Sequence, residues 1–158
     1  MTAADDYTLA PVHKTITVAA PRELAFQVFT ERMTAWWPLT SHHIGAAPAV
    51  AAVVEPLVGG RWFERGDDGS ECTWGRVLAW EPPTRLVLDW QITADWRFDG
   101  DLHTTVEVQF IAIDDAHTRV ELEHRDLQAY GARAAEMQGV FDSAGGWPGL
   151  LAAFAAAT

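Results

Sequence analysis

The stretch from Val58 to Ile92 reads VGGRWFERGDDGSECTWGRVLAWEPPTRLVLDWQI, and it decides the fold. Two turn signals, GDDGS at Gly66–Ser70 and EPPT at Glu81–Thr84, divide it into segments rich in β-branched and aromatic residues. An Asp-Gly pair between such segments is a strong signal for a β-hairpin. We therefore expect consecutive antiparallel strands at Arg61–Arg65, Glu71–Trp80 and Arg85–Ile92.

Four further segments have the composition of strands: Val12–Val18, Val50–Leu57, His103–Ile113 and Thr118–His124. Alternation of apolar and polar residues places every second side chain of a strand on one face. Together the seven segments predict a curved antiparallel sheet of about seven strands with one solvated face. Its inward rows are Leu86, Leu88 and Trp90, then Val106, Val108 and Phe110, and finally Val120, Leu122 and His124.

Helices are expected on both sides of this run of strands. Ala19–Thr30 and Glu31–Trp37 should form two short helices after the first strand, and the second should end before Pro38. Ala132–Phe141 predicts another short helix. In the closing segment GWPGLLAAFAAAT the apolar residues recur at i, i+3, i+4 and i+7, which indicates a helix packed on an apolar surface. This order predicts an α+β fold in which the C-terminal helix covers the sheet and leaves a cavity beneath it.

Length and charge limit the class of protein. The chain has 158 residues, so we expect one domain over residues 1–158 with a loose segment at 1–11. The formal net charge of −11 argues against nucleic acid and anionic membranes, because both attract clustered Lys and Arg. Cys72, the only cysteine, cannot form an internal disulfide, which predicts a reducing cytoplasmic location. The sequence has no recognisable signal peptide and no apolar run long enough to span a membrane.

Eight tryptophans against two tyrosines are the unusual feature of the composition. Tryptophan is bulky and rarely fully buried, so we expect several indoles to face a cavity instead of filling a core. Buried indole N–H groups also need partners, which water or a ligand in a cavity can supply. The alternative is that all of them pack a tight core. The candidate ligand-contacting side chains are Phe26, Trp36, Trp37, Trp62, Trp74, Leu88, Trp90, Val108, Phe110, Leu122, His124, Trp147 and Leu151.

Three stretches resemble a known family: Val58–Ile92, TTVEVQFIAIDDAHTRVELEH at Thr104–His124, and GGWPGLLAAF at Gly145–Phe154. They are similar to the START-like, helix-grip (SRPBCC) superfamily, and within it to bacterial homologues of the activator of heat-shock-protein-90 ATPase. The resemblance begins at about Val12. It implies a helix-grip fold with a long C-terminal helix across the sheet. Related folds bind lipids, hormones or polyketides, and a few catalyse cyclisation, so the fold alone does not fix the function.

The polar candidates give no complete catalytic or metal-binding set. His42 and His43 are adjacent and should point to opposite sides of an extended loop, so we expect no metal site and no cofactor. One of them could border the cavity. We interpret His124 first as a core histidine bonded to a backbone carbonyl, second as a polar anchor for a ligand, and third as a general base. Cys72 has no predicted activator, and the DWRFDGD loop at Asp95–Asp101 is long enough to act as a flap.

Three functions remain open at this stage. The first is binding of a small, mostly apolar and in some cases aromatic molecule, without catalytic residues. The second is a co-chaperone-like protein-interaction module. The third is a cyclase or hydrolase that would use polar cavity residues such as His124 or Glu64. A homodimer is also compatible with the sequence.

Overall fold

The computed structural model describes residues 9–158 and is built on a seven-stranded antiparallel sheet in the order β1-β7-β6-β5-β4-β3-β2. All neighbouring strands pair antiparallel, as consecutive hairpins require. The strands are β1 (Val12–Val18), β2 (Ala49–Val54), β3 (Arg61–Gly66), β4 (Glu71–Glu81), β5 (Arg85–Trp90), β6 (Thr104–Asp114) and β7 (His117–Arg125).

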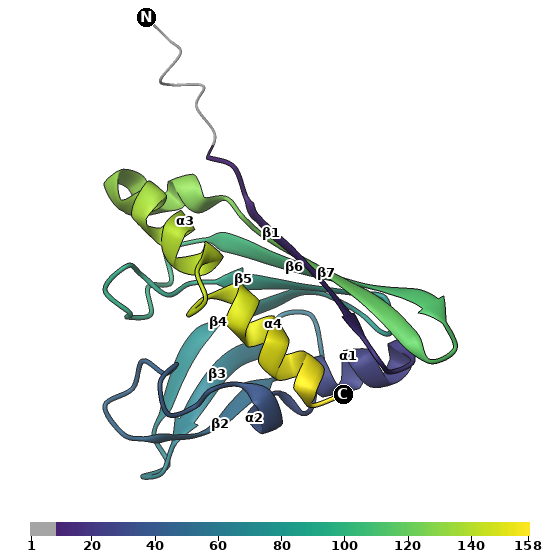
Figure 1. Cartoon of the computed structure of the whole chain (residues 1–158). Helices are drawn as coiled ribbons and strands as arrows, with labels where there is room; N and C mark the ends of the chain where they lie inside the picture. The colour runs from purple at the N-terminus through teal and green to yellow at the C-terminus, as the bar shows by residue number, and fades with distance from the viewer. Residues whose placement is uncertain (1–8) are drawn as a thin grey trace, which may run out of the picture.

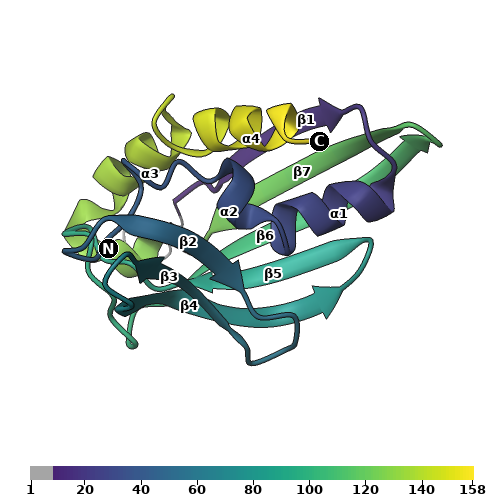
Figure 2. The same ribbon diagram turned by 90° about the horizontal axis from the view of Figure 1, so that it is seen from below.

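The helices cover the concave side of the sheet. Figures 1 and 2 show α1, α2 and α4 on this side, with α4 crossing the sheet and α3 lying at one end of it. The predicted α+β helix-grip fold is therefore confirmed. The helical elements are α1 (Arg22–Thr30), α2 (Met33–Trp36), the 3-10 segment η1 (Leu127–Arg133), α3 (Ala134–Asp142) and α4 (Trp147–Ala156).

The inward rows of β5, β6 and β7 are confirmed. Leu86, Val106, Val120 and their row neighbours have no more than 5% of their surface exposed. Helix α1 places Phe29 on them, and the C-terminal helix adds Phe154, which packs edge-on against Phe29 with ring centroids 5.2 Å apart. Burying each large apolar side chain contributes roughly 1.5–3 kcal/mol, so these rows hold the sheet and the helices together.

A bulge and a glycine curl the sheet where β3, β4 and β5 meet. The register between β3 and β4 shifts after Trp62, so Trp74 is an extra residue and both indoles turn inward, with at most 1% exposed. The sequence could not fix this register, because both faces of these strands carry apolar residues. At Gly75 the backbone of β5 approaches so closely that a Cβ atom would lie 1.6 Å from the carbonyl oxygen of Asp89. Only glycine fits there.

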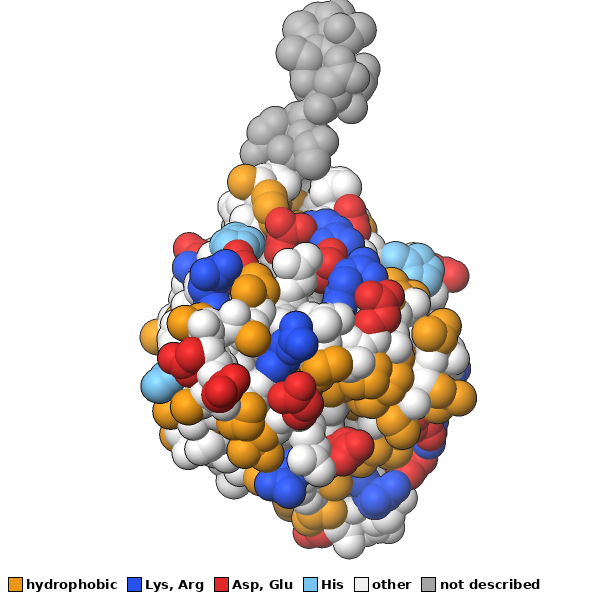
Figure 3. Space-filling model, turned by 90° about the vertical axis from the view of Figure 1, so that its right-hand side faces the viewer, with side chains coloured by type: hydrophobic (Ala, Val, Ile, Leu, Met, Phe, Trp, Pro, Cys, Tyr) orange, Lys and Arg blue, Asp and Glu red, His pale blue; other side chains and the backbone are white. Residues whose placement is uncertain are grey.

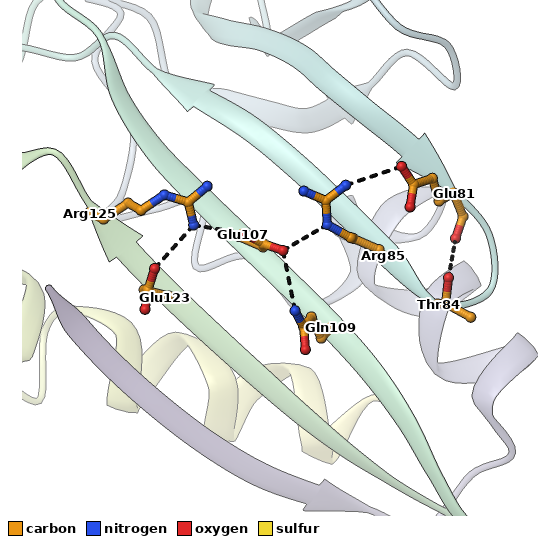
Figure 4. Close-up of polar contacts among 7 residues, drawn as sticks. All are labelled: Glu81, Thr84, Arg85, Glu107, Gln109, Glu123 and Arg125. Atoms are coloured by element: carbon orange, nitrogen blue, oxygen red, sulfur yellow. Dashed lines mark hydrogen bonds and ion pairs between the residues drawn. The ribbon is translucent and has the colours of Figure 1, made fainter.

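The outer face of the sheet is polar and is held by ion pairs (Figure 4). Glu107 on β6 accepts hydrogen bonds from Arg85 Nε and Arg125 Nη1, each at 2.7 Å, and from Gln109 Nε2 at 3.3 Å. Burial opposes ionisation of Glu107, but these donors outweigh it and lower its pKa to about 2. On the side seen in Figure 3, acidic and basic side chains are interspersed over the surface.

Several boundaries differ from those predicted. The second helix is shorter than Glu31–Trp37, because Trp37 is already extended, and the segment before α3 is a 3-10 turn with non-helical Gly131. Of the segment expected to be loose, residues 1–8 lie outside the described residues. Leu9 is buried, and the Ala10 carbonyl accepts a hydrogen bond from Gln138 Nε2 at 2.6 Å. No helix among residues 9–158 is both long and apolar enough to cross a membrane.

Candidate functional site

A cavity of about 400 Å³ opens at the end of the sheet where α3 lies. Its wall comes from three places: the segment from Trp37 to Ile44 between α2 and β2, the ends of β4 and β5 with the loop that follows, and the junction of α3 with α4. These segments converge on the left of Figure 1. This volume lies within the range of sites for small organic ligands.

Tryptophans dominate this wall: Trp37, Trp74, Trp90, Trp96 and Trp147. The rings of Trp37, Trp74, Trp90 and Trp147 form a connected surface. The centroids of Trp37 and Trp74 are 5.0 Å apart, those of Trp37 and Trp147 are 6.3 Å apart, and Trp147 lies 5.9 Å from Trp90. Flat aromatic surfaces of this kind offer large contact area with little loss of conformational freedom.

The protein itself satisfies most of the buried indole N–H groups. The expectation that a closed core would strand them is therefore wrong for five of the six buried tryptophans. Their acceptors lie close by in the fold, and several are side chains distant in sequence. In residues 9–158, Trp90 Nε1 is the buried indole nitrogen without a partner. The observed bonds are Trp36 to the Val28 carbonyl, Trp37 to the His42 carbonyl, Trp62 to Met33 Sδ, Trp74 to Glu64 Oε1, and Trp147 to His124 Nδ1.

Glu64 on β3 fixes the loop that forms one side of the cavity. Its carboxylate is 2% exposed and accepts hydrogen bonds from Ile44 N at 2.6 Å, Gly45 N at 3.1 Å and Trp74 Nε1 at 2.8 Å. A buried carboxylate needs such donors to offset the loss of hydration. Glu64 therefore joins the loop to the aromatic wall, and its oxygens are occupied by the protein.

The two adjacent histidines both line the cavity but have different partners. His42 Nε2 lies 2.8 Å from the Gly145 carbonyl oxygen, and its Nδ1 lies 2.7 Å from Ser41 Oγ. His43 Nδ1 lies 3.0 Å from the Gly45 carbonyl oxygen. His42 thus links the loop before β2 to the junction between α3 and α4, which lies 103 residues further along the chain.

His124 lies behind the wall and not at the cavity edge. It has no exposed surface, because Phe141, Trp90 and Trp147 cover its ring. The sequence interpretation of His124 as a core histidine agrees with this burial. Its hydrogen-bond partners, however, are side chains and not a backbone carbonyl. The indole of Trp147 can only donate, so Nδ1 accepts, and Nε2–H donates to Thr104 Oγ1 at 2.9 Å. Burial lowers the pKa of His124 to about 3.

The structure places the predicted ligand-contacting residues in three groups. Four of them, Trp37, Trp74, Trp90 and Trp147, lie on the cavity wall. Phe26 lies beside a separate hollow between α1 and the turn from β4 to β5. Over the middle of the sheet, α1, α2 and α4 fill the space, so residues that face inward there meet side chains instead of a cavity. The seven residues buried in this core are Trp36, Trp62, Leu88, Val108, Phe110, Leu122 and Leu151. His124 is buried behind the cavity wall.

Several wall residues were not among the candidates. Trp96 lies in the loop that was predicted to be long enough to act as a flap, is 45% exposed, and has a positive φ of 62°. Phe141 and Val140 come from α3, whose inward face was not assigned from the sequence. Leu150 comes from the apolar face of α4, which the helical spacing indicated, although it was not named as a candidate. The sequence offered one signal for Trp96 as a wall residue, namely that a tryptophan lies within the loop proposed as a flap. Among residues 9–158 no group of three His, Cys, Asp or Glu side chains could hold a metal ion.

Comparison with known proteins gives a consistent family. A sequence model described as Activator of Hsp90 ATPase homolog 1-like protein matches residues 19–158. A solved structure of an anthrahydroquino-gamma-pyrone synthase, Txn09, is 38% identical with a TM-score of 0.67, and the match covers 96% of this chain and 98% of that one. CalC, a self-sacrificing resistance protein from Micromonospora echinospora, is 32% identical with a TM-score of 0.69, covering 93% and 92%. The search of curated proteins finds no match.

Proposed function

The chain belongs to the Activator of Hsp90 ATPase homolog 1-like family. We propose that it binds a planar, mostly apolar aromatic molecule in the tryptophan-walled cavity. The observation that carries the proposal is the wall itself, in which five indoles surround a space of about 400 Å³. Stacked and edge-on contacts between aromatic rings stabilise such complexes beyond simple burial of area.

The polar groups at the cavity are few and lie on one side. Ser41, His42 and His43 belong to the segment before β2, and Ser143 lies at the end of α3. The hydrogen bond between His42 Nε2 and the Gly145 carbonyl oxygen brings these two segments together. A ligand with a polycyclic apolar body and a polar edge matches this division. Sites for small molecules generally combine an apolar lining with a few polar groups that set the orientation of the ligand.

One of the relatives above 30% identity supports a ligand of this class by its name. Txn09 is named as a synthase of an anthrahydroquino-gamma-pyrone, which is a polycyclic aromatic compound. CalC is named as a resistance protein. The name of the synthase also makes a cyclase-type enzyme the second candidate function, one that would use the same cavity. No contact or surface described above favours a protein-interaction module.

Binding can be tested with 1,2-dihydroxyanthraquinone as the planar probe and tryptophan fluorescence as the readout. We expect saturable quenching by the wild-type protein. Trp96→Ala should weaken binding by about tenfold, because it removes a stacking surface from the wall. Trp96 is suited to this test because it is half exposed and makes a small contribution to the core.

Phe98→Ala is the matched control. Phe98 lies on the same loop and is 43% exposed, but it does not line the cavity. We expect its affinity for the probe to stay within about twofold of the wild-type value, since a surface substitution away from the site has little effect. An absence of quenching, confirmed by calorimetry, would refute the proposed function. An equal loss of affinity in both variants would show that the probe binds elsewhere on the loop.

A further inference from the structure

The ring of His43 has one nitrogen that the protein uses and one that it leaves unused. The Gly45 carbonyl, 3.0 Å from Nδ1, can only accept, so Nδ1 carries the hydrogen and donates. In the neutral ring, Nε2 then has a free lone pair. Among residues 9–158 no hydrogen-bond partner of Nε2 is found, and the side chain is 25% exposed on the cavity wall.

A buried carboxylate, that of Glu64, lies close to the ring of His43. Glu64 Oε2 lies 3.8 Å from His43 Nδ1, on the same side as the Gly45 carbonyl oxygen. The carboxylate cannot turn away, because Ile44 N, Gly45 N and Trp74 Nε1 hold both of its oxygens. A histidine whose one nitrogen is oriented by acceptors and whose other nitrogen is free has the arrangement of a general base.

The neighbouring His42 lacks this arrangement. Its Nε2–H donates to the Gly145 carbonyl oxygen at 2.8 Å, so its Nδ1 is the acceptor and receives the Ser41 hydroxyl hydrogen at 2.7 Å. Both nitrogens of His42 are therefore engaged, and among residues 9–158 no carboxylate forms an ion pair with it. The two histidines of the cavity wall differ in a way that experiment can separate.

We propose that His43 is a general base that removes the proton from a phenolic hydroxyl of the aromatic molecule bound in the cavity. This inference rests on the proposed binding function. Nε2 accepts the proton, the ring becomes an imidazolium, and Nδ1–H keeps its bond to the Gly45 carbonyl oxygen. The Glu64 carboxylate, held 3.8 Å away, stabilises the positive charge that forms on the ring.

The step is balanced and needs no further reactant. The O–H bond of the phenol breaks, its electron pair stays on oxygen, and a new N–H bond forms on His43. A phenolate made in this way can add to an electron-poor C=C bond conjugated to a carbonyl in the same molecule. A C–O bond forms, the electrons of the C=C bond move to the carbon beside the carbonyl, and that carbon takes the proton back from His43. The product is an isomer of the substrate, so the reaction class is an intramolecular ring closure.

The absorption spectrum of bound 1,2-dihydroxyanthraquinone tests the proton transfer, because its phenol and phenolate forms have different colours. The measurement uses the full-length protein at saturation, at the pH where the free probe is half ionised. An apolar cavity alone favours the neutral phenol. We expect the phenolate-to-phenol ratio of the bound probe to fall by about tenfold in His43→Gln, since a hydrogen bond to a charged partner has about this effect.

Three comparisons decide between explanations. His117→Gln should keep the wild-type ratio, because His117 is an exposed histidine at the distant turn between β6 and β7, where its ring contacts Asp114. A His43→Gln protein that binds the probe with an unchanged ratio overturns the role of His43 and leaves the binding function standing. A ratio that falls in His42→Gln but not in His43→Gln overturns it in favour of the neighbouring ring. If the wild-type protein does not bind the probe, both proposals are overturned. This outcome is distinguishable from a failure of proton transfer alone, because the spectrum then remains that of the free probe.

Discussion

The buried ring of His124 makes a quantitative prediction about stability and pH. Its Nδ1 accepts the indole hydrogen of Trp147, so protonation of this nitrogen must break that bond inside a closed aromatic environment. Burial lowers the pKa of His124 to about 3, against 6.5 for an unperturbed histidine. The perturbation that isolates this group is His124→Gln, whose amide can still accept from Trp147 and donate to Thr104 but cannot titrate.

The sign follows from proton linkage. Between pH 6.5 and about 3 the unfolded chain binds a proton at His124 that the folded chain excludes, so stability is present above pH 6.5 and falls as pH falls. Each unit below 6.5 costs about 1.4 kcal/mol, so lowering the pH from 7.5 to 5.0 should remove about 2 kcal/mol from the wild type. In His124→Gln this decrease of about 2 kcal/mol in the free energy of unfolding should be absent.

Urea unfolding at pH 7.5 and 5.0, for both proteins, measures the difference. Comparison of the two proteins cancels other histidines, including His103, whose pKa is raised by its hydrogen bond to Asp89 and which therefore acts in the opposite direction. If the free energy of unfolding falls by the same amount from pH 7.5 to pH 5.0 in the wild type and in His124→Gln, His124 is not the source of the pH dependence. If the variant does not fold, ring resonances of wild-type His124 decide the matter, since a midpoint near 6.5 in the folded protein contradicts the buried neutral ring.

Further predictions concern the groups that shape the sheet and the cavity. Glu64→Gln should lower the free energy of unfolding in urea by about 2–3 kcal/mol, because an amide cannot accept from all three N–H donors. Glu71→Gln on the exposed surface should change it much less, because solvent screens the ion pairs of Glu71. Equal effects in the two variants would contradict the role given to Glu64. Gly75→Ala should cost more than about 4 kcal/mol or prevent folding, because its Cβ would overlap the Asp89 carbonyl. A Gly75→Ala protein that folds with wild-type stability would contradict the close approach of β5 to Gly75. Gly139→Ala should stabilise the protein by about 0.5–1 kcal/mol in the same assay, because open space surrounds this position on α3.

The fold could be predicted because its information is local. Alternation along β5, β6 and β7 gave the inward rows, and the spacing of Trp147, Leu150, Leu151 and Phe154 gave the inner face of α4. Asp-Gly and Pro-Pro pairs marked the turns. Each of these signals lies within a few residues of the feature it specifies, so one sequence is sufficient to read it.

The site could be predicted only in part because it depends on contacts between distant segments. Glu64 reaches Ile44 across 20 residues, and His42 reaches Gly145 across 103. No periodicity encodes such pairs. The position of the cavity has the same origin, since it lies where α3 and two loops leave space at one end, while α1, α2 and α4 fill the middle of the sheet. Composition suggested an aromatic lining but could not say which indoles would be packed and which would remain at the wall.

The cavity wall and the protein core form one continuous aromatic cluster, and this limits how a ligand preference could change. Trp62 contacts both Trp37 and Trp90, with ring centroids 6.0 and 5.5 Å apart, so the indoles of the wall rest directly on those of the core. Replacing a large core aromatic costs roughly 3–5 kcal/mol, a large share of the stability of a domain. Changes of specificity that preserve folding are therefore confined to the exposed rim, where Trp96, Ser41 and Ser143 meet the cavity without supporting the sheet.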